Sequence, residues 1–171
     1  MKNVKLITIA FLTFLIAVSP CSILQPNKVK AAPSQIENIT RMGGADRFET
    51  SVKIAKQGWN HSGNVVLADA QGNNAFADAI AGTSLAYNLD CPILLTNVNN
   101  TPDIIKNEIS KLGAKNIYIL GGTGVISGSQ ENSLKVSGYN TIRIAGSNRF
   151  DTACKAADIL NSKSKINKIY I

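Results

Sequence analysis

Residues 41–55 read RMGGADRFETSVKIA, and residues 143–157 read RIAGSNRFDTACKAA. The two stretches share seven identical positions and begin 102 residues apart. A short apolar run follows each of them, NVVL at Asn64–Leu67 after the first and KIYI at Lys168–Ile171 after the second. Self-similarity at such a distance indicates a duplicated structural unit. The sequence therefore predicts one complete repeat followed by the beginning of a second.

Apolar runs of strand length alternate with segments of helical pattern along most of the chain. The runs suit strands that are covered on both faces, as in a parallel sheet, and they are Asn64–Ala68, Pro92–Thr96, Asn116–Leu120, Thr141–Ala145 and Lys168–Ile171. The helix candidates are Phe48–Gln57, Ala75–Asn88, Pro102–Leu112, Ser129–Val136 and Arg149–Asn161. This alternation predicts an α/β fold, a layered parallel-sheet repeat domain of Rossmann-like or Toprim-like type.

The first 31 residues have the pattern of a secretory signal peptide. A basic start precedes an apolar run from Leu6 to Val18, which is shorter than the about 20 residues of an ordinary membrane span. We expect cleavage after residue 31, and an uncleaved N-terminal anchor is the alternative. The predicted organisation is then a signal peptide over 1–31, a polar leader over 32–40, a first repeat over 41–142 and a truncated second repeat over 143–171.

Removal of the signal peptide changes the charge balance of the chain. Residues 1–31 hold four lysines and no acidic residue, so 14 of the 18 Lys and Arg residues remain against 11 Asp and Glu, a net charge of +3. This balance lacks the dense basic stripe of a nucleic-acid-binding protein, and we expect neither nucleic acid nor, after signal removal, membrane as a partner. A secreted, mildly basic protein suits an anionic polymer at the cell wall or cell surface.

The sequence offers no catalytic or metal-binding constellation. Cys91 and Cys154 lack metal-ligand spacing, and the single histidine, His61, lies in a turn-rich stretch that predicts an exposed loop. Cys154 takes the repeat position of Val52, which predicts a buried thiol, and a disulfide with Cys91 is the alternative. The glycines of Ile119–Ser127 lack the spacing of a dinucleotide-binding loop. We expect no enzymatic activity, no cofactor and no metal.

Much of the repeated stretch is explained as the start of a helix. Asp46 and Asn148 are favourable N-cap residues, and Glu49 and Asp151 follow three positions later, as in a capping box. An apolar stripe then continues along each helix, with Phe48, Val52 and Ala55 in the first copy and Phe150, Cys154 and Ala157 in the second. These residues are expected to build the fold.

The repeated arginines are harder to explain by folding alone. Arg47 and Arg149 fall in the first helical turn, where the helix dipole disfavours a positive charge by about 0.3–1 kcal/mol. A cation in both copies indicates an anionic partner, either an internal carboxylate or an external phosphate or carboxylate. The internal partner is favoured for Arg47. Arg41 and Arg143, beside glycines at strand ends, are expected to be freer to face a ligand.

A polar stretch, LADAQGNNAFADA, runs from the end of a strand into a helix. In open α/β sheets, ligands collect at the carboxyl ends of strands. Asp69, Asn73, Asn74 and Asp78 would lie there, where they form either a polar site or a turn in which Asn74 caps the helix. Asp69 and Asp78 are also the candidate internal partners for the arginine of the first copy.

At these residues the chain resembles the cell wall binding repeat 2 family of clostridia and related Gram-positive bacteria. The family's opening, Arg-x-x-Gly-x-Asp-Arg-[Phe/Tyr]-x-Thr-Ala, is matched by Arg41–Ser51, with serine in the last place, and by Arg143–Ala153, with asparagine in the aspartate position. A strand and Asp-Ala helix (VVLADAQGNNAFADAIAG), a Pro-Ile-Leu-Leu strand at Pro92–Leu95 and a Gly-Gly strand end at Ile119–Gly122 follow in order. The matches extend from Arg41 to Ile171.

The resemblance implies a non-enzymatic module that anchors surface-layer proteins and secreted hydrolases to the wall by binding an anionic polymer, teichoic-acid-like or polysaccharide. It also implies a trimer-like assembly with further repeats around a pseudo-threefold axis. The polymer-binding candidates are Arg41, Arg47, Asn73, Arg143, Arg149, Ile93, Leu94 and Leu95. The alternative is a fragment of a cell-wall hydrolase of the N-acetylmuramoyl-L-alanine amidase type, whose catalytic domain is absent from this sequence.

Overall fold

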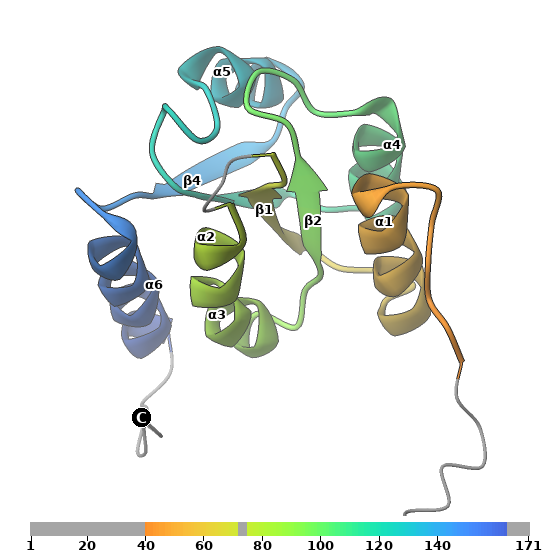
Figure 1. Ribbon diagram of the computed structural model, residues 1–171, viewed down its shortest axis with the longest axis horizontal. Helices are drawn as coiled ribbons and strands as arrows, with labels where there is room; N and C mark the ends of the chain where they lie inside the picture. The colour runs from red at the N-terminus through yellow and green to blue at the C-terminus, as the bar shows by residue number, and fades with distance from the viewer. Residues whose placement is uncertain (1–39, 72–74, 164–171) are drawn as a thin grey trace, which may run out of the picture. The chain divides into compact units, whose positions relative to one another are not determined.

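A four-stranded parallel sheet forms the centre of the fold (Figure 1). The computed structural model describes residues 40–71 and 75–163. The strands lie in the order β2-β1-β3-β4, and they are β1 (Asn64–Asp69), β2 (Ile93–Thr96), β3 (Asn116–Leu120) and β4 (Asn140–Ile144). The predicted α/β parallel-sheet fold is confirmed, and these four strands end within one residue of their predicted bounds. The signal peptide and the strand predicted at Lys168–Ile171 lie outside the described residues.

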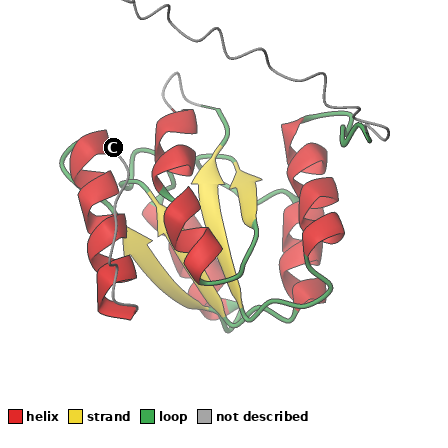
Figure 2. Ribbon diagram, turned by 90° about the horizontal axis from the view of Figure 1, so that it is seen from below, coloured by secondary structure: helices red, strands yellow, loops and turns green. Residues whose placement is uncertain are grey.

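Helices connect the strands and cover both faces of the sheet (Figure 2). They are α1 (Arg47–Gly58), α2 (Ala75–Ala81), α3 (Thr83–Asn88), α4 (Asp103–Leu112), α5 (Gly128–Val136) and α6 (Arg149–Lys163). The sequence predicts α2 and α3 as one helix, whereas the structure divides them at Gly82. A Cβ at Gly82 would collide with the side chain of Leu120, so glycine lets the chain pass close to the sheet.

The strands divide their side chains between two hydrophobic cores because successive residues point to opposite faces. On one face, Val65 and Leu67 of β1 pack with residues of α1, α4 and α5. On the other face, Val66 and Ala68 pack with α3 and α6, and α2 also contacts α6. Every residue of β1 after the first is buried, as the nearly continuous apolar runs predict for strands covered on both sides.

The order of the strands creates a crevice between β1 and β3. The chain leaves β1 through α2 and α3 toward β2, whereas it leaves β3 through α5 toward β4 on the other side. Neighbouring strands whose connections diverge in this way frame the usual ligand position of open α/β sheets, at their carboxyl ends. Within the described residues, no helix combines the length and hydropathy needed to span a membrane.

Candidate functional site

The first copy of the repeated stretch forms a tight turn that caps α1. Oδ1 of Asp46 accepts the amide of Glu49 at 2.7 Å, and the Glu49 carboxylate accepts the amide of Ala45 at 2.5 Å. The Thr50 hydroxyl accepts the amide of Gly44 at 2.9 Å, and a Cβ on Gly44 would lie 2.6 Å from the Thr50 nitrogen. The predicted N-cap at Asp46 is confirmed, whereas the Glu49 carboxylate accepts the amide one residue before the cap rather than that of the cap itself. The bond from Ala45 lowers the pKa of the Glu49 carboxyl.

The second copy forms the same turn before α6. Oδ1 of Asn148 accepts the amide of Asp151 at 3.0 Å, and the Asp151 carboxylate accepts the amide of Ser147 at 2.8 Å. The Thr152 hydroxyl accepts the amide of Gly146 at 3.0 Å, and the hydrogen bond from Ser147 lowers the pKa of Asp151. The repeated glycine, threonine and acidic residue therefore build the turn in both copies.

The apolar stripes of the two helices have different surroundings. In α1 the stripe packs on the sheet, and Val52 is only 1 % exposed. In α6 Phe150 is 71 % exposed and Cys154 is also exposed, because α6 packs on α2 and α3 with a different side, which carries Ala156. The prediction of a buried Cys154 is therefore wrong. Cys91 is buried, and both thiols are free rather than joined.

Two of the repeated arginines lie at the carboxyl-terminal edge of the sheet. Nη1 of Arg47 donates to the carbonyl of Ala70, immediately after β1. This partner is a neutral carbonyl rather than the carboxylate that the sequence favours. Arg149, the first residue of α6, is exposed, and its guanidinium carbon lies 5.3 Å from the centroid of the Phe150 ring. Both side chains therefore bring positive charge to one edge of the sheet.

The other two arginines have opposite environments. Nε of Arg143 donates to Oε2 of Glu131 at 2.7 Å and its Nη1 donates to the carbonyl of Gly121 at 2.8 Å, so only 15 % of the side chain is exposed. Lys135 and Arg143 both lower the pKa of the Glu131 carboxyl. Arg143 thus differs from the expectation that it faces a ligand, because α5 places an acid beside β4. Arg41 at the equivalent position is exposed.

The three apolar candidates belong to the edge strand β2. Leu94 is fully buried in the core beneath α1. Ile93 and Leu95 are partly buried against the core of the other face, and the Leu95 amide donates to Oγ of Ser51 in α1 at 3.4 Å. Ile93 and Leu95 thus keep some exposed surface, whereas Leu94 keeps none. Asn73, the remaining candidate, lies outside the described residues.

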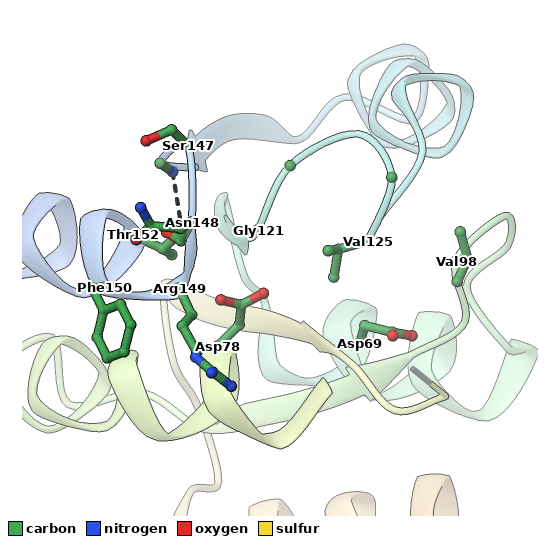
Figure 3. Close-up of a pocket in the computed structure, with 13 residues that line it drawn as sticks. Asp69, Asp78, Val98, Gly121, Val125, Ser147, Asn148, Arg149, Phe150 and Thr152 are labelled. Atoms are coloured by element: carbon green, nitrogen blue, oxygen red, sulfur yellow. Dashed lines mark hydrogen bonds between the residues drawn. The ribbon is translucent and has the colours of Figure 1, made fainter. Parts of the chain in front are cut away.

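A cleft of about 730 Å³ opens at the carboxyl ends of the strands (Figure 3). This volume lies within the range of roughly 300–1,000 Å³ that small-ligand sites occupy. The lining comes from the ends of β1 and β3, from α2 and from the start of α6, and includes Asp69, Asp78, Val98, Gly121, Gly122, Gly124, Val125, Asn148 and Arg149. The cleft therefore occupies the crevice that the strand order predicts.

Two buried acidic side chains contribute to this cleft. Asp69 is 3 % exposed and accepts the Gln71 amide at 3.1 Å. Asp78 is 8 % exposed, and its carboxyl points into the cleft beside Gly121 (Figure 3). A Cβ on Gly121 would lie 2.8 Å from Oδ2 of Asp78, and the φ of Gly121 is +97°. Burial, followed by the charge of Asp69, raises the pKa of Asp78.

Comparison with curated proteins finds two relatives from Bacillus subtilis. It is 34 % identical over 162 residues to N-acetylmuramoyl-L-alanine amidase LytC of Bacillus subtilis, across 95 % of this chain and 30 % of the relative. It is 28 % identical over 160 residues to the amidase enhancer of the same organism, across 93 % and 22 %. The chain thus spans less than a third of the length of these relatives.

Comparison with solved structures agrees with the fold. Cwp6 from Clostridium difficile superposes with a TM-score of 0.69 at 36 % identity, across 75 % of this chain and 20 % of that one. Cwp8 from the same organism gives a TM-score of 0.63 at 31 % identity, across 68 % and 20 %. The model of the family described as cell wall binding domain 2 (CWB2) matches residues 41–131, more than half of the sequence. The chain therefore belongs to the cell wall binding domain 2 family.

Proposed function

We propose that this chain anchors a secreted protein non-covalently to the cell wall by binding an anionic wall polymer, teichoic-acid-like or polysaccharide. Membership of the CWB2 family makes it a cell wall binding domain associated with the cell surface. The nature of the polymer, secretion by a signal peptide over residues 1–31 and the contacts are our proposal. The observation that carries it is the placement of two arginines at one edge of the sheet, where Arg149 lines the cleft and Arg47 donates to the carbonyl of Ala70 just after β1.

The chemistry of this edge suits phosphate or carboxylate groups. Arg47 and Arg149 each begin a helix of more than ten residues, where backbone amides point outward and the dipole favours negative charge. A guanidinium group carries five N–H donors and binds such anions through charge-assisted hydrogen bonds. The contact to Ala70 uses Nη1 of Arg47 and holds the side chain at the strand end.

The polymer contacts that we propose form a subset of the sequence candidates. Arg41, Arg47 and Arg149 are exposed, and Ile93 and Leu95 keep partial exposure. Arg143 is held by its ion pair with Glu131, and Leu94 lies in the hydrophobic core. We therefore expect Arg143 and Leu94 to support the fold of the binding edge rather than to touch the polymer.

A sedimentation assay with isolated Gram-positive cell walls tests this proposal. We expect Arg47→Ala combined with Arg149→Ala to weaken binding by about tenfold or more, since a hydrogen bond to a charged group contributes about 1.5–3 kcal/mol. Binding of the unchanged protein should also weaken as salt screens the charges. Lys115→Ala removes an exposed charge beside the amino end of β3 and serves as the matched control. Undiminished, salt-insensitive binding by the double variant would refute the anionic contact.

We also propose that the exposed stripe of α6 packs against further repeats. The equivalent residues of α1 bury themselves on the sheet of the first repeat, and Val52 is only 1 % exposed. Phe150 and Cys154 carry the same pattern in α6 with no such cover among the described residues. A sheet supplied by the second repeat would cover them in the same way and would lead to the trimer-like assembly.

The amidase relative favours a second candidate, in which the chain is the wall-binding part of a hydrolase. The alignment with LytC covers 95 % of this chain but only 30 % of the relative. The described residues hold no group of three or more His, Cys, Asp or Glu that could bind a metal ion. We propose that catalysis, if it accompanies this domain, resides in another segment. Release of soluble fragments from purified peptidoglycan by this chain alone would overturn that assignment.

A further inference from the structure

We infer that the cleft between the carboxyl ends of β1 and β3 binds an uncharged sugar unit of the wall polymer through its hydroxyl groups. This inference rests on the proposed wall binding and adds which part of the polymer enters the cleft. Anionic groups of the polymer would remain at the rim, with Arg47 and Arg149.

The acceptors are the two buried carboxyl groups. Oδ1 of Asp69 accepts the backbone amide of Gln71. Asp78 is only 8 % exposed, and among residues 40–71 and 75–163 no hydrogen-bond donor reaches its carboxyl. The carboxyl oxygens of Asp78 can therefore accept hydrogen bonds from a bound molecule. A ligand hydroxyl in the cleft can donate to them (Figure 3).

The donors are backbone amides of the glycine-rich loop after β3. The carbonyl of Gly122 accepts the amides of Val125 and Ile126 at 3.0 and 3.1 Å, which holds the loop in place. In the described part of the chain, the amides of Gly122 and Gly124 have no acceptor. A Cβ at either glycine would meet nothing within 4 Å, so a ligand can approach this backbone closely.

A sugar hydroxyl fits this combination better than an ion does. A hydroxyl both donates and accepts, so one ring can use the carboxyl groups and the glycine amides together. Among the described lining residues, the carboxyl groups of Asp69 and Asp78 outnumber the one cation, Arg149, so the charge of the cleft disfavours phosphate. Calcium takes 6–8 oxygen ligands, several of them carboxylates as a rule, whereas no cluster of three or more acidic, His or Cys side chains occurs in the described ranges.

Amide NMR of the ¹⁵N-labelled protein tests the inference directly. The probes are glucose, galactose, mannose and their 2-acetamido derivatives, with inorganic phosphate and calcium chloride as the ionic alternatives. We expect at least one of the six neutral sugars to shift the amides of Gly121, Gly122 and Gly124 in a saturable manner. Phosphate should instead shift amides at the starts of α1 and α6. Calcium should shift neither set.

Two variants and one control connect the signal to the cleft. Asp78→Asn should weaken sugar binding by about tenfold or more, because it replaces a charged acceptor. Gly124→Val should abolish sugar binding without unfolding the protein, because the added side chain enters open space at the lining of the cleft. Asp158→Asn removes an exposed acid from α6 outside the cleft and should change nothing.

Several outcomes would overturn the inference. They are the absence of any shift with all six sugars, a response of these glycines to calcium or phosphate instead, or equal sugar binding by both cleft variants. The failure of this inference is distinguishable from failure of wall anchoring. Walls that retain the protein in an arginine-dependent manner, without sugar shifts, would leave the anchoring proposal intact. Sugar shifts without wall retention would refute the anchoring proposal instead.

Discussion

The helix starts at α1 and α6 have nearly the same sequence and the same turn, yet different neighbours. Gly44 and Gly146 donate to equivalent threonine hydroxyls at 2.9 and 3.0 Å. By contrast, Arg41 is exposed, whereas Arg143 is partly buried and forms an ion pair with Glu131. The repeated glycine and threonine therefore form the same turn in both copies, while the repeated arginines have different contacts. The turn thus depends on the local sequence, whereas the contacts of the arginines depend on the surrounding fold.

The two helices also bury opposite sides. Val52 of α1 is buried while Ile54 is 47 % exposed. In α6 the equivalent positions reverse, since Cys154 is exposed and Ala156 is only 3 % exposed. Each helix thus has two apolar sides and uses one of them within the described residues. The side of each helix that remains exposed among the described residues is the surface on which we propose that another repeat packs.

The largest expected difference between the copies is at the arginines before each turn. Arg143→Ala removes the hydrogen bonds of the guanidinium group to Glu131 and to the carbonyl of Gly121 and should lower the free energy of unfolding by about 2–3 kcal/mol. Arg41→Ala should change it by less than about 0.5 kcal/mol, as is usual for exposed positions. Urea denaturation of the two variants measures both values. Equal losses would show that Arg41 is also held internally.

The turn itself should respond alike in both copies. A Cβ at Gly44 or Gly146 would lie 2.5 Å from atoms of the following helix turn, so Gly44→Ala and Gly146→Ala should each destabilise by about 2 kcal/mol. Chemical denaturation followed by circular dichroism gives the two values. A Gly146→Ala variant with unchanged stability would contradict the equivalence of the turns.

Substitutions in the apolar stripes of α1 and α6 should have different effects on stability, and the exposed thiol of α6 should react with reagents. Val52→Ala should cost about 1.5–2.5 kcal/mol because it removes two buried methyl groups, whereas Cys154→Ala should change stability by less than about 0.5 kcal/mol. A thiol reagent at neutral pH should label Cys154 rapidly, while burial raises the pKa of Cys91 to about 12 and protects it. Slow labelling of Cys154 in this chain would contradict its exposure.

The smallest expected effect is the loss of folding stability at low pH that comes from Glu131. The pKa of Glu131 is lower in the folded protein than in the unfolded chain, so its stabilisation is present above the unfolded value and is lost as the pH falls through the folded value. We expect this loss to be about 1 kcal/mol or less, since partial exposure screens the pair. The slope of unfolding free energy against pH in that window should flatten in Glu131→Gln. An unchanged slope would assign the acid sensitivity to other carboxyl groups.

Local features of the sequence predicted the structure well, and long-range contacts did not. The N-cap at Asp46 depends on residues three positions apart, and each strand is recognisable from its own apolar run. The pairing of Arg143 with Glu131 depends on how α5 packs beside β4. The buried amide of Gln130, which lies 2.7 Å from the Thr96 hydroxyl and 2.8 Å from the Thr101 hydroxyl, likewise joins segments about thirty residues apart. Neither contact has a local pattern.

The site was predictable to a similar extent. The polar stretch around Asp69 and Asp78 indicated the correct edge of the sheet, because ligands collect where parallel strands end. The glycine amides of the β3 loop were missed, since the sequence shows glycines there without showing which amides lack an acceptor. The exposure of Cys154 was missed because the repeat pattern describes the helix but not the face of the sheet on which it packs.

The turn between β4 and α6 has a mechanical consequence. Only residues 145–148 separate the strand from the helix, and Lys155 Nζ also holds the carbonyl of Ala145 at 2.8 Å. Successive repeats would therefore be joined without a flexible hinge. A pulling force on α6 would therefore be transmitted directly to β4. The backbone hydrogen bonds between β4 and β3 would bear this force in shear, and the junction would resist it without bending.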